Sequence, residues 1–204
     1  HKLITGRYDS FHTLRQLGGI SGFPKRAESP YDVYDTGHAA GSISYALGLA
    51  KARDLSSEDY SVVAVIGDGA LTSGIAYEGL NNAGELRTPL IVVLNDNSMS
   101  ISENVGGMSK YLTMLRLAPV YRSAKAAVEK MLDQMPSGSS TISLLRRFKG
   151  SLKHFLLPEA WFEALGFRYY GPVDGHDIGG LKRVLKEAKA LREPVFIHVV
   201  TQKG

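Results

Sequence analysis

The sequence contains no cysteine and one tryptophan, and none of its apolar runs approaches the length of a membrane-spanning helix. Without cysteine the chain forms neither disulfide bonds nor thiolate metal sites, which agrees with a reducing compartment. A helix that crosses a bilayer needs roughly 20 consecutive apolar residues. We therefore expect a soluble protein with no membrane partner.

A strong imbalance of charge is also absent. The chain has 24 basic and 20 acidic residues, a net charge of +4, and both signs are spread along most of its length. The one local excess is basic and lies between Arg146 and Lys153; a solvated helix face explains it more simply than a phosphate-attracting segment. Zinc-finger, RNA-recognition and interleaved aromatic patterns are missing. We expect no nucleic-acid partner.

Segments typical of strands and helices alternate along the chain. The runs Val62–Ile66 and Leu90–Leu94 are continuously apolar and rich in β-branched residues, as in strands that helices cover on both faces. Apolar residues at helical spacing predict the helices between them. The predicted strands are 62–66, 90–94, 167–170 and 195–200, and the predicted helices are 39–53, 72–86, 115–135, 143–157, 158–165 and 178–191. This alternation predicts an α/β fold with a doubly wound, mostly parallel sheet flanked by helices.

At 204 residues with 44% hydrophobic content, the chain is long enough for one large domain. We expect residues 1–204 to be the incomplete first domain of a longer protein, because His1 is not an initiator methionine and Gly204 follows directly on the last strand. Within it, residues 98–109 are predicted to form a loop, 109–157 a mobile helical segment, and 171–177 a turn.

Oxygen-bearing side chains follow two of the predicted strands. Gly67-Asp68-Gly69 follows the first apolar run, and Asn95-Asp96-Asn97 ends the second. Because the carboxyl ends of parallel strands meet at one edge of a sheet, the carboxylate of Asp68 and the amide oxygen of Asn97 can meet there. Glycines around Asp68 allow the backbone to approach a bulky anion such as diphosphate. Such oxygens are also the ligands that Mg²⁺ prefers, so the pattern predicts a Mg²⁺-dependent diphosphate site.

Other phosphate-binding patterns fit this segment less well. The glycine spacing of dinucleotide folds is absent, and no Gly-Lys-Ser/Thr follows as in a P-loop. A phosphatase would carry a second acid two positions after its nucleophile, where Ala70 stands here. A lone Gly-Asp-Gly is often a plain turn, but its pairing with Asn-Asp-Asn after the next strand argues against that explanation.

The two tripeptides resemble the thiamine diphosphate-binding motif, and the chain resembles the 1-deoxy-D-xylulose-5-phosphate synthase family from end to end. The segments that carry this resemblance are Tyr34-Asp35-Thr36-Gly37-His38-Ala39, Ser42-Ile43-Ser44, Ile66–Thr72, Glu78–Gly84, Leu94–Asn104 and Gly171–Asp177. The resemblance implies a transferase that condenses pyruvate with D-glyceraldehyde 3-phosphate, with loss of CO₂, to 1-deoxy-D-xylulose 5-phosphate, a precursor in isoprenoid, thiamine and pyridoxal synthesis. It further implies thiamine diphosphate and Mg²⁺ as cofactors, a homodimer, and a cytoplasmic location, or the plastid stroma in a plant or alga.

The resemblance also assigns roles to individual residues. Asp68 and Asn97 would bind Mg²⁺, with the carbonyl of Met99 as a further ligand. Gly69 and Ala70 would contact the diphosphate through their backbone. His38 would act as a catalytic residue, and the implied cofactor-binding residues are Gly37, His38, Ala39, Gly69, Ala70 and Asn97.

Three side chains have simpler explanations beside the functional ones. His38 could be an ordinary residue of a turn before a helix, although the resemblance favours contact with the cofactor or a bound intermediate. For His176 a turn before a helix, capped by Asp177, is the simpler explanation. Glu78 occupies the position where the related transketolases place a carboxylate at the subunit interface, and a solvated or capping role is equally open.

In the family, a glutamate of a second, pyrimidine-binding domain activates the cofactor. Neither this domain, nor a C-terminal domain, nor the family's upstream Asp-Val-Gly-His-Gln segment is among these residues. We therefore expect the 204 residues alone to be inactive as a synthase. Two other functions stay open: another transketolase-like thiamine diphosphate enzyme, and a non-catalytic Mg²⁺-binding module that serves subunit association.

Overall fold

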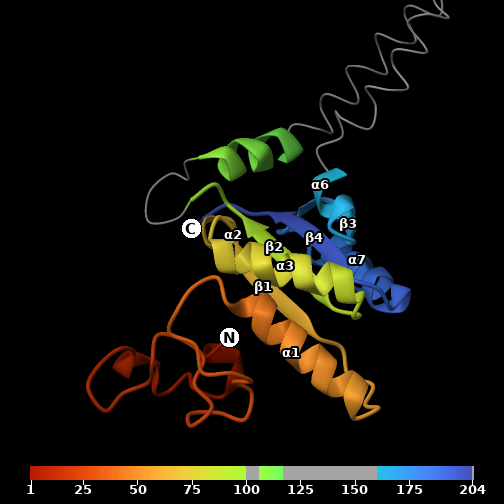
Figure 1. Ribbon diagram of the computed structural model, residues 1–204. Coiled ribbons are helices and arrows are strands. Elements are labelled where there is room, and N and C mark those ends of the chain that lie inside the picture. Colours follow the sequence, from red (N-terminus) through yellow and green to blue (C-terminus); the bar gives the residue numbers. More distant parts are fainter. Residues whose placement is uncertain (100–105, 117–159, 204) are drawn as a thin grey trace, which may run out of the picture. The chain divides into compact units, whose positions relative to one another are not determined.

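The computed structural model describes residues 1–99, 106–116 and 160–203, and the chain divides into two compact units, His1–Ala39 and Ala40–Gly204. The first unit consists of turns and two short 3-10 helices, η1 (Leu3–Thr5) and η2 (Phe11–Thr13). The second unit contains the sheet and the longer helices (Figure 1). No helix among the described residues is both long enough and apolar enough to cross a membrane.

A parallel sheet forms the centre of the second unit. In the described residues its strands are β1 (Val63–Gly67), β2 (Ile91–Asp96), β3 (Arg168–Asp174) and β4 (Val195–Val200), in the order β1-β2-β4-β3. Each neighbouring pair runs parallel. The predicted α/β fold with a parallel sheet is therefore confirmed.

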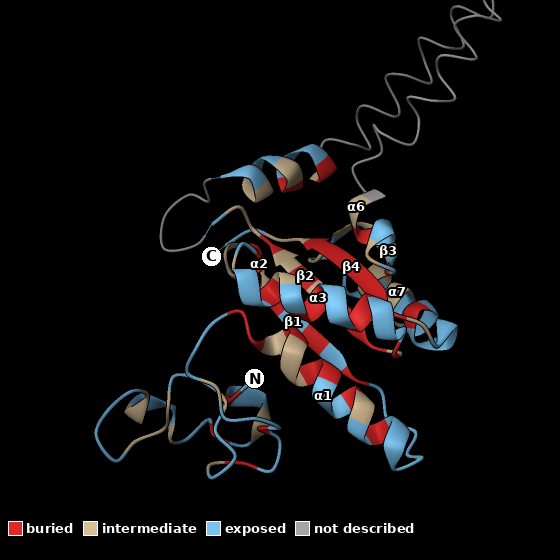
Figure 2. Ribbon diagram, viewed as in Figure 1, coloured by how far each residue is buried: buried red, intermediate tan, exposed pale blue. Residues whose placement is uncertain are grey.

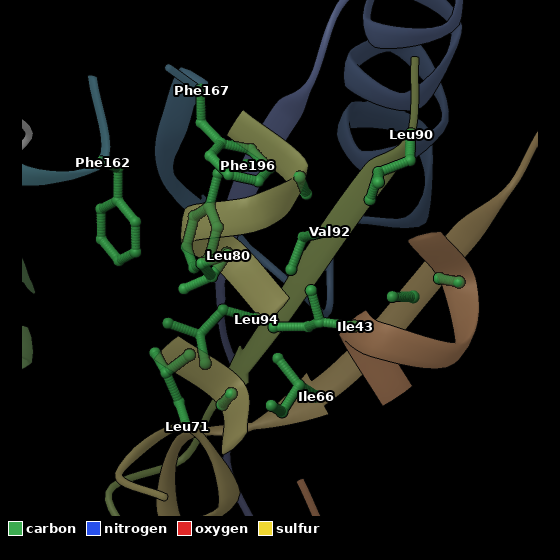
Figure 3. Packing of buried hydrophobic residues seen from close by; sticks show 14 of the residues in the cluster. Ile43, Ile66, Leu71, Leu80, Leu90, Val92, Leu94, Phe162, Phe167 and Phe196 are labelled. Carbon is green, nitrogen blue, oxygen red and sulfur yellow. The ribbon is translucent and has the colours of Figure 1, made fainter. Parts of the chain in front are cut away.

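Helices cover both faces of the two central strands, β2 and β4. On one face Val92, Leu94 and Phe196 pack in a core with α1 (Ser42–Leu55) and α3 (Gly74–Leu86), as Figure 3 shows. On the other face Ile91 and Ile197 pack against α7 (Ile178–Leu191). Because side chains alternate across a strand, a continuous apolar run can fill both cores.

Strand β1 differs from the prediction that both of its faces are covered. Ala64 and Ile66 are buried in the core with α1 and α3. Val63 and Val65, on the opposite face, are 46% and 62% exposed. Figure 2 shows the contrast with β4, which is buried along nearly its whole length. In the described residues β1 is therefore an edge strand with one open face.

The small residues of α3 permit two close approaches. A Cβ atom on Gly79 would lie 3.0 to 3.2 Å from side-chain atoms of Ser44 and Ile43 of α1. A Cβ atom on Gly84 would lie 1.6 Å from the carbonyl oxygen of Leu165, at the turn that leads into β3. The prediction that the small residues of this helix allow another helix or backbone to approach is confirmed.

Several predicted boundaries need correction. The helix predicted from residue 72 is interrupted: α2 (Asp68–Leu71) forms one turn, and α3 begins at Gly74. The predicted loop 98–109 ends earlier, because residues 107–116 are helical and bury Leu112 and Leu115 in the core. Apolar side chains on one face of this short segment supply the packing that a loop would lack.

The C-terminal part follows the sequence more closely. Helix α6 (Ala160–Ala164) lies within the predicted segment 158–165, and α7 has the predicted bounds. Strand β3 runs through most of the predicted turn 171–177, with an irregular register between Tyr170 and Val173. Most of the predicted helix 115–135, the whole predicted helix 143–157 and most of the segment 109–157 predicted to be mobile lie outside the described residues.

A buried group of charges organises the first unit. The guanidinium of Arg7 donates to both carboxylate oxygens of Asp32, at 2.6 and 2.8 Å, and Lys2 donates to Glu28 at 2.7 Å. The hydrogen bond from Arg7 lowers the pKa of Asp32 to about 2, and the hydrogen bond from Lys2 lowers the pKa of Glu28 to about 2. The two ionised carboxylates therefore stabilise this unit.

We expect the first unit to lose this stabilisation between about pH 4 and pH 2. Both pKa values are depressed from ordinary values of 3.8 and 4.5, so the contribution is complete above those values and disappears as the pH falls through the folded ones. Carboxyl chemical shifts followed by NMR should give midpoints near 2 for Asp32 and Glu28. In Arg7→Met the Asp32 midpoint should rise toward its ordinary value, and an unchanged midpoint would contradict the assignment.

Candidate diphosphate and metal site

The carboxyl ends of β1 and β2 bring the two predicted oxygen-bearing segments to one edge of the sheet. The strands pair in parallel with Gly67 opposite Asn95. Asp68 follows β1 as the first residue of α2, and Asn97 follows β2 directly. The geometry of the parallel pair therefore places Asp68 and Asn97 at the same edge, as the spacing predicts.

Two buried carboxyl groups are neighbours at this edge. Asp68 is 2% exposed and Asp96 is fully buried. Burial and the neighbouring Asp96 carboxylate raise the pKa of Asp68. Burial also opposes ionisation of Asp96, but His198 and Arg116 outweigh it and lower the pKa of Asp96. A divalent cation would relieve the repulsion between two such carboxylates, so the pair is suited to hold one nearby.

A set of polar contacts that the sequence did not predict holds Asp96. His198 Nε2 lies 2.8 Å from Oδ2, the Ser98 N–H donates to Oδ1 at 3.1 Å, and Arg116 Nε lies 3.3 Å from Oδ2. The other ring nitrogen of His198 lies 2.9 Å from the hydroxyl of Tyr169. The one signal in the sequence was a polar residue, His198, inside an otherwise apolar strand.

Hydrogen bonds donated by backbone N–H groups fix the turn after β2. Ser98, whose N–H donates to Asp96, has a left-handed backbone with φ of 63°. The Met99 N–H donates to Asn97 Oδ1 at 3.0 Å. The Thr201 N–H donates to the carbonyl of Asp96 at 2.9 Å and ties the turn to the end of β4. Asn97 is partly exposed and Met99 is exposed, so this turn presents both residues toward solvent.

The predicted diphosphate contacts, Gly69 and Ala70, lie in the single turn of α2. The Gly69 N–H donates to the carboxylate of Asp68 at 3.0 Å, and the Thr72 hydroxyl donates to the carbonyl of Gly69 at 2.7 Å. Gly69 and Ala70 are both partly exposed. The backbone next to the buried carboxylate is therefore open to solvent at the same sheet edge.

The other predicted cofactor-lining residues belong to the first unit. Gly37, His38 and Ala39 close that unit and are exposed. The Thr36 hydroxyl donates to the carbonyl of His38 at 3.1 Å. The two groups of predicted residues thus lie in different units, and contact of His38 with a cofactor stays a prediction.

The turn explanation of His176 gains direct support. Its Nε2 accepts a hydrogen bond from the Gln202 N–H at 3.0 Å, which joins the turn after β3 to the chain beyond β4. Asp177 caps α7 as expected, because its carboxylate accepts from the Gly180 N–H at 2.9 Å. Glu78 is exposed on α3, and its predicted role at a subunit interface stays a prediction.

The donors at this edge fit Mg²⁺. The Asp68 carboxylate, the Asn97 amide and a backbone carbonyl are hard oxygen ligands. Within the described ranges, no group of three or more His, Asp or Glu side chains could hold a metal ion. A metal at this edge would therefore need amide, carbonyl and diphosphate oxygens beside its carboxylate, which is the coordination typical of Mg²⁺ bound with a phosphate ligand.

A cleft at the opposite edge of the sheet is less suited to bind a charged ligand than the edge that carries Asp68 and Asn97. It lies before β1 and β2, between Tyr60 and Leu90. Four of its charged side chains form ion pairs with one another: Arg53 with Asp54 at 2.7 Å, and Arg192 with Asp59 at 3.4 Å. Paired charges leave less attraction for an added anion or cation than the two adjacent carboxyl groups described above.

Comparison with known proteins places the chain in one family throughout. The family model described as 1-deoxy-D-xylulose-5-phosphate synthase matches residues 1–201. The protein of that name from Pelotomaculum thermopropionicum is 58% identical over 204 residues, and the one from Clostridium kluyveri is 54% identical over 205 residues. Both matches cover 100% of this chain, and 32% and 33% of those proteins. The chain thus spans about a third of the length of these relatives.

Solved structures support the fold. Transketolase from Leishmania mexicana matches with a TM-score of 0.60 and 24% identity, and transketolase from Campylobacter jejuni with a TM-score of 0.62 and 21% identity. Each match covers 95% of this chain and 24% of the transketolase chain. At these identities the similarity concerns the arrangement of strands and helices.

Proposed function

Because the chain belongs to the 1-deoxy-D-xylulose-5-phosphate synthase family, we propose that it anchors thiamine diphosphate through Mg²⁺ in an enzyme of that activity. The whole enzyme would condense pyruvate with D-glyceraldehyde 3-phosphate, with loss of CO₂, to 1-deoxy-D-xylulose 5-phosphate. The observation that carries the proposal is the buried Asp68 carboxyl beside Asp96, with Asn97 following the adjacent parallel strand. This arrangement supplies hard oxygens and negative charge where an α/β sheet binds its ligands.

The residues of this chain would mainly bind the metal and the diphosphate end of the cofactor. Asp68 and Asn97, with the carbonyl of Met99, would hold the metal, and the backbone of Gly69 and Ala70 would face the diphosphate. When bound, thiamine diphosphate supplies the carbanion that adds to the carbonyl carbon of pyruvate. A fixed diphosphate end positions the reacting ring, and such positioning accounts for a large part of catalysis.

In the first unit, Gly37, His38 and Ala39 would line the cofactor, with His38 close enough to the reacting groups to exchange a proton. An exposed imidazole suits this role because it can both donate and accept a proton. The resemblance to the family also supports a homodimer, in which the exposed Glu78 of α3 would face the partner.

The proposal predicts the products of a direct assay. The full-length protein that carries these residues, given pyruvate and D-glyceraldehyde 3-phosphate, should form 1-deoxy-D-xylulose 5-phosphate in a reaction that needs both Mg²⁺ and thiamine diphosphate. Mass spectrometry of the products would detect it, and sedimentation of the same sample should show a dimer. Turnover with a ketose donor in place of pyruvate would instead indicate a transketolase.

Two controls separate the remaining functions. The 204 residues assayed alone should show no turnover, since in the proposed enzyme the activating glutamate would belong to another domain. Calorimetry of the full-length protein with thiamine diphosphate and Mg²⁺ should show binding. An absence of binding would contradict the proposal and favour a non-catalytic association module.

A further inference from the structure

His198 is a polar side chain in an apolar environment. It lies in β4 between Ile197 and Val199, and it is fully buried. Its two ring nitrogens lie within hydrogen-bond distance of Asp96 and Tyr169, at 2.8 and 2.9 Å. Because burying an imidazole without partners costs free energy, both contacts are needed for the ring to be accommodated there.

The chemistry of the partners gives these hydrogen bonds a direction. A carboxylate only accepts hydrogen bonds, so the proton of the contact between Asp96 and His198 is on Nε2 of His198. In the neutral ring Nδ1 is then an acceptor, and the Tyr169 hydroxyl donates to it. Tyr169 therefore selects the tautomer in which His198 donates to Asp96.

Asp96 transmits this contact to the predicted metal ligands. Its Oδ1 accepts from the Ser98 N–H and so holds the turn whose neighbouring residues are Asn97 and Met99. Its side chain also contacts the carboxyl group of Asp68. The buried Asp96 carboxylate thus contacts both segments that would hold Mg²⁺, the one at Asp68 and the turn after β2. His198 binds its second oxygen, Oδ2.

Arg116 also contacts Asp96, but in a different manner. Its side chain is 25% exposed, and its Nε lies 3.3 Å from Asp96 Oδ2. It belongs to the helical residues 107–116 rather than to the sheet. The shorter contact, from the fully buried His198 of β4, is therefore the one that fixes the orientation of the Asp96 carboxylate.

We propose that His198 is a positioning residue for Mg²⁺: through Asp96 it fixes the Asn97–Met99 turn and the neighbouring Asp68, with Tyr169 selecting its tautomer. The inference rests on the proposed function. Removing a residue that hydrogen-bonds to the metal ligands, and so orients them, typically lowers metal affinity by about 10 to 100-fold.

The test compares two substitutions of His198 in the full-length protein. Glutamine can place an amide N–H near the position of Nε2, whereas leucine removes the donor. We expect His198→Leu to weaken Mg²⁺ binding at saturating thiamine diphosphate by about 10 to 100-fold in calorimetry. His198→Gln should restore most of this affinity. In assays, the Mg²⁺ concentration for half-maximal rate should rise in His198→Leu, while kcat at saturating Mg²⁺ should change little.

A matched control separates positioning from general destabilisation. Phe196 lies on the same strand and the same face, is fully buried, and stacks on Phe162 at a centroid distance of 3.8 Å. Phe196→Leu should lower the unfolding temperature but leave Mg²⁺ affinity unchanged. Tyr169→Phe, which removes only the hydroxyl, should weaken Mg²⁺ binding less than His198→Leu.

Three results would overturn the inference while leaving the proposed function intact. These are wild-type Mg²⁺ affinity in a folded His198→Leu protein, an equal loss of affinity in His198→Gln, and an equal loss in Phe196→Leu. If the wild-type protein binds no thiamine diphosphate with Mg²⁺, the proposed function fails, and the role of His198 fails with it.

Discussion

Replacing Asp68 with asparagine should greatly weaken Mg²⁺-dependent binding of thiamine diphosphate, while the cofactor-free protein should become at least as stable as the wild type. Burial and the Asp96 carboxylate raise the pKa of Asp68, so its charged form destabilises the fold when no cation is present. A neutral amide of the same shape removes that repulsion. It also removes the anionic ligand, and we expect a loss of Mg²⁺ affinity of roughly 100-fold or more, beyond the effect of indirect partners.

Calorimetry with Mg²⁺ and thiamine diphosphate, together with thermal unfolding without either, would measure both effects. Asp59→Asn is a suitable control, because the Asp59 side chain is 88% exposed and lies at the other edge of the sheet. It should change neither quantity. A variant of Asp68 that unfolds more easily and still binds the cofactor would show that this carboxylate has a structural role.

Replacing Gly84 with alanine should destabilise the second unit by about 3 kcal/mol or more. The added Cβ would lie 1.6 Å from the carbonyl oxygen of Leu165, and backbone atoms cannot move aside as a flexible side chain does. Gly166, in the turn before β3, also approaches α3 closely, with its Cβ position 2.9 Å from the carbonyl oxygen of Gly84. Relief of the clash therefore requires α3 and this turn to separate.

Gly48→Ala provides the matched comparison for this prediction. Gly48 lies inside α1, is exposed, and has no atom within 4 Å of its Cβ position. There alanine should stabilise the protein by about 0.5 to 1 kcal/mol, because it lowers the entropy lost when the helix forms. Urea unfolding of both variants would give the two free energies. Equal unfolding midpoints for the two variants would show that α3 tolerates a side chain at position 84.

Local patterns predicted the elements that carry their own signals. Helix α7 has the predicted bounds because its apolar residues recur at helical spacing and Asp177 caps it. Strand β2 is covered on both faces, as its continuous apolar run indicates. The open face of β1 was not predictable. A run of valines is favourable in a strand whether a helix covers one of its faces or both, so the sequence does not distinguish the two cases.

Parallel topology explains why the edge that carries Asp68 and Asn97 was predictable. Each residue follows a strand, and two adjacent parallel strands end at the same edge. The partners of Asp96 were not predictable in this way. His198 is 102 positions away from Asp96, and no periodicity links one buried polar residue to another across that separation.

The pairing of β2 with β4 also sets an order of events during synthesis. Leu94 pairs with His198, so β2 leaves the ribosome long before its partner strand exists. At about 5 to 20 residues per second, the separation between Asp96 and His198 corresponds to a delay of roughly 5 to 20 s. Throughout that interval the Asp96 carboxylate lacks its imidazole partner. In the proposed function, cofactor capture by the nascent chain would therefore follow the synthesis of β4 and its pairing with β2.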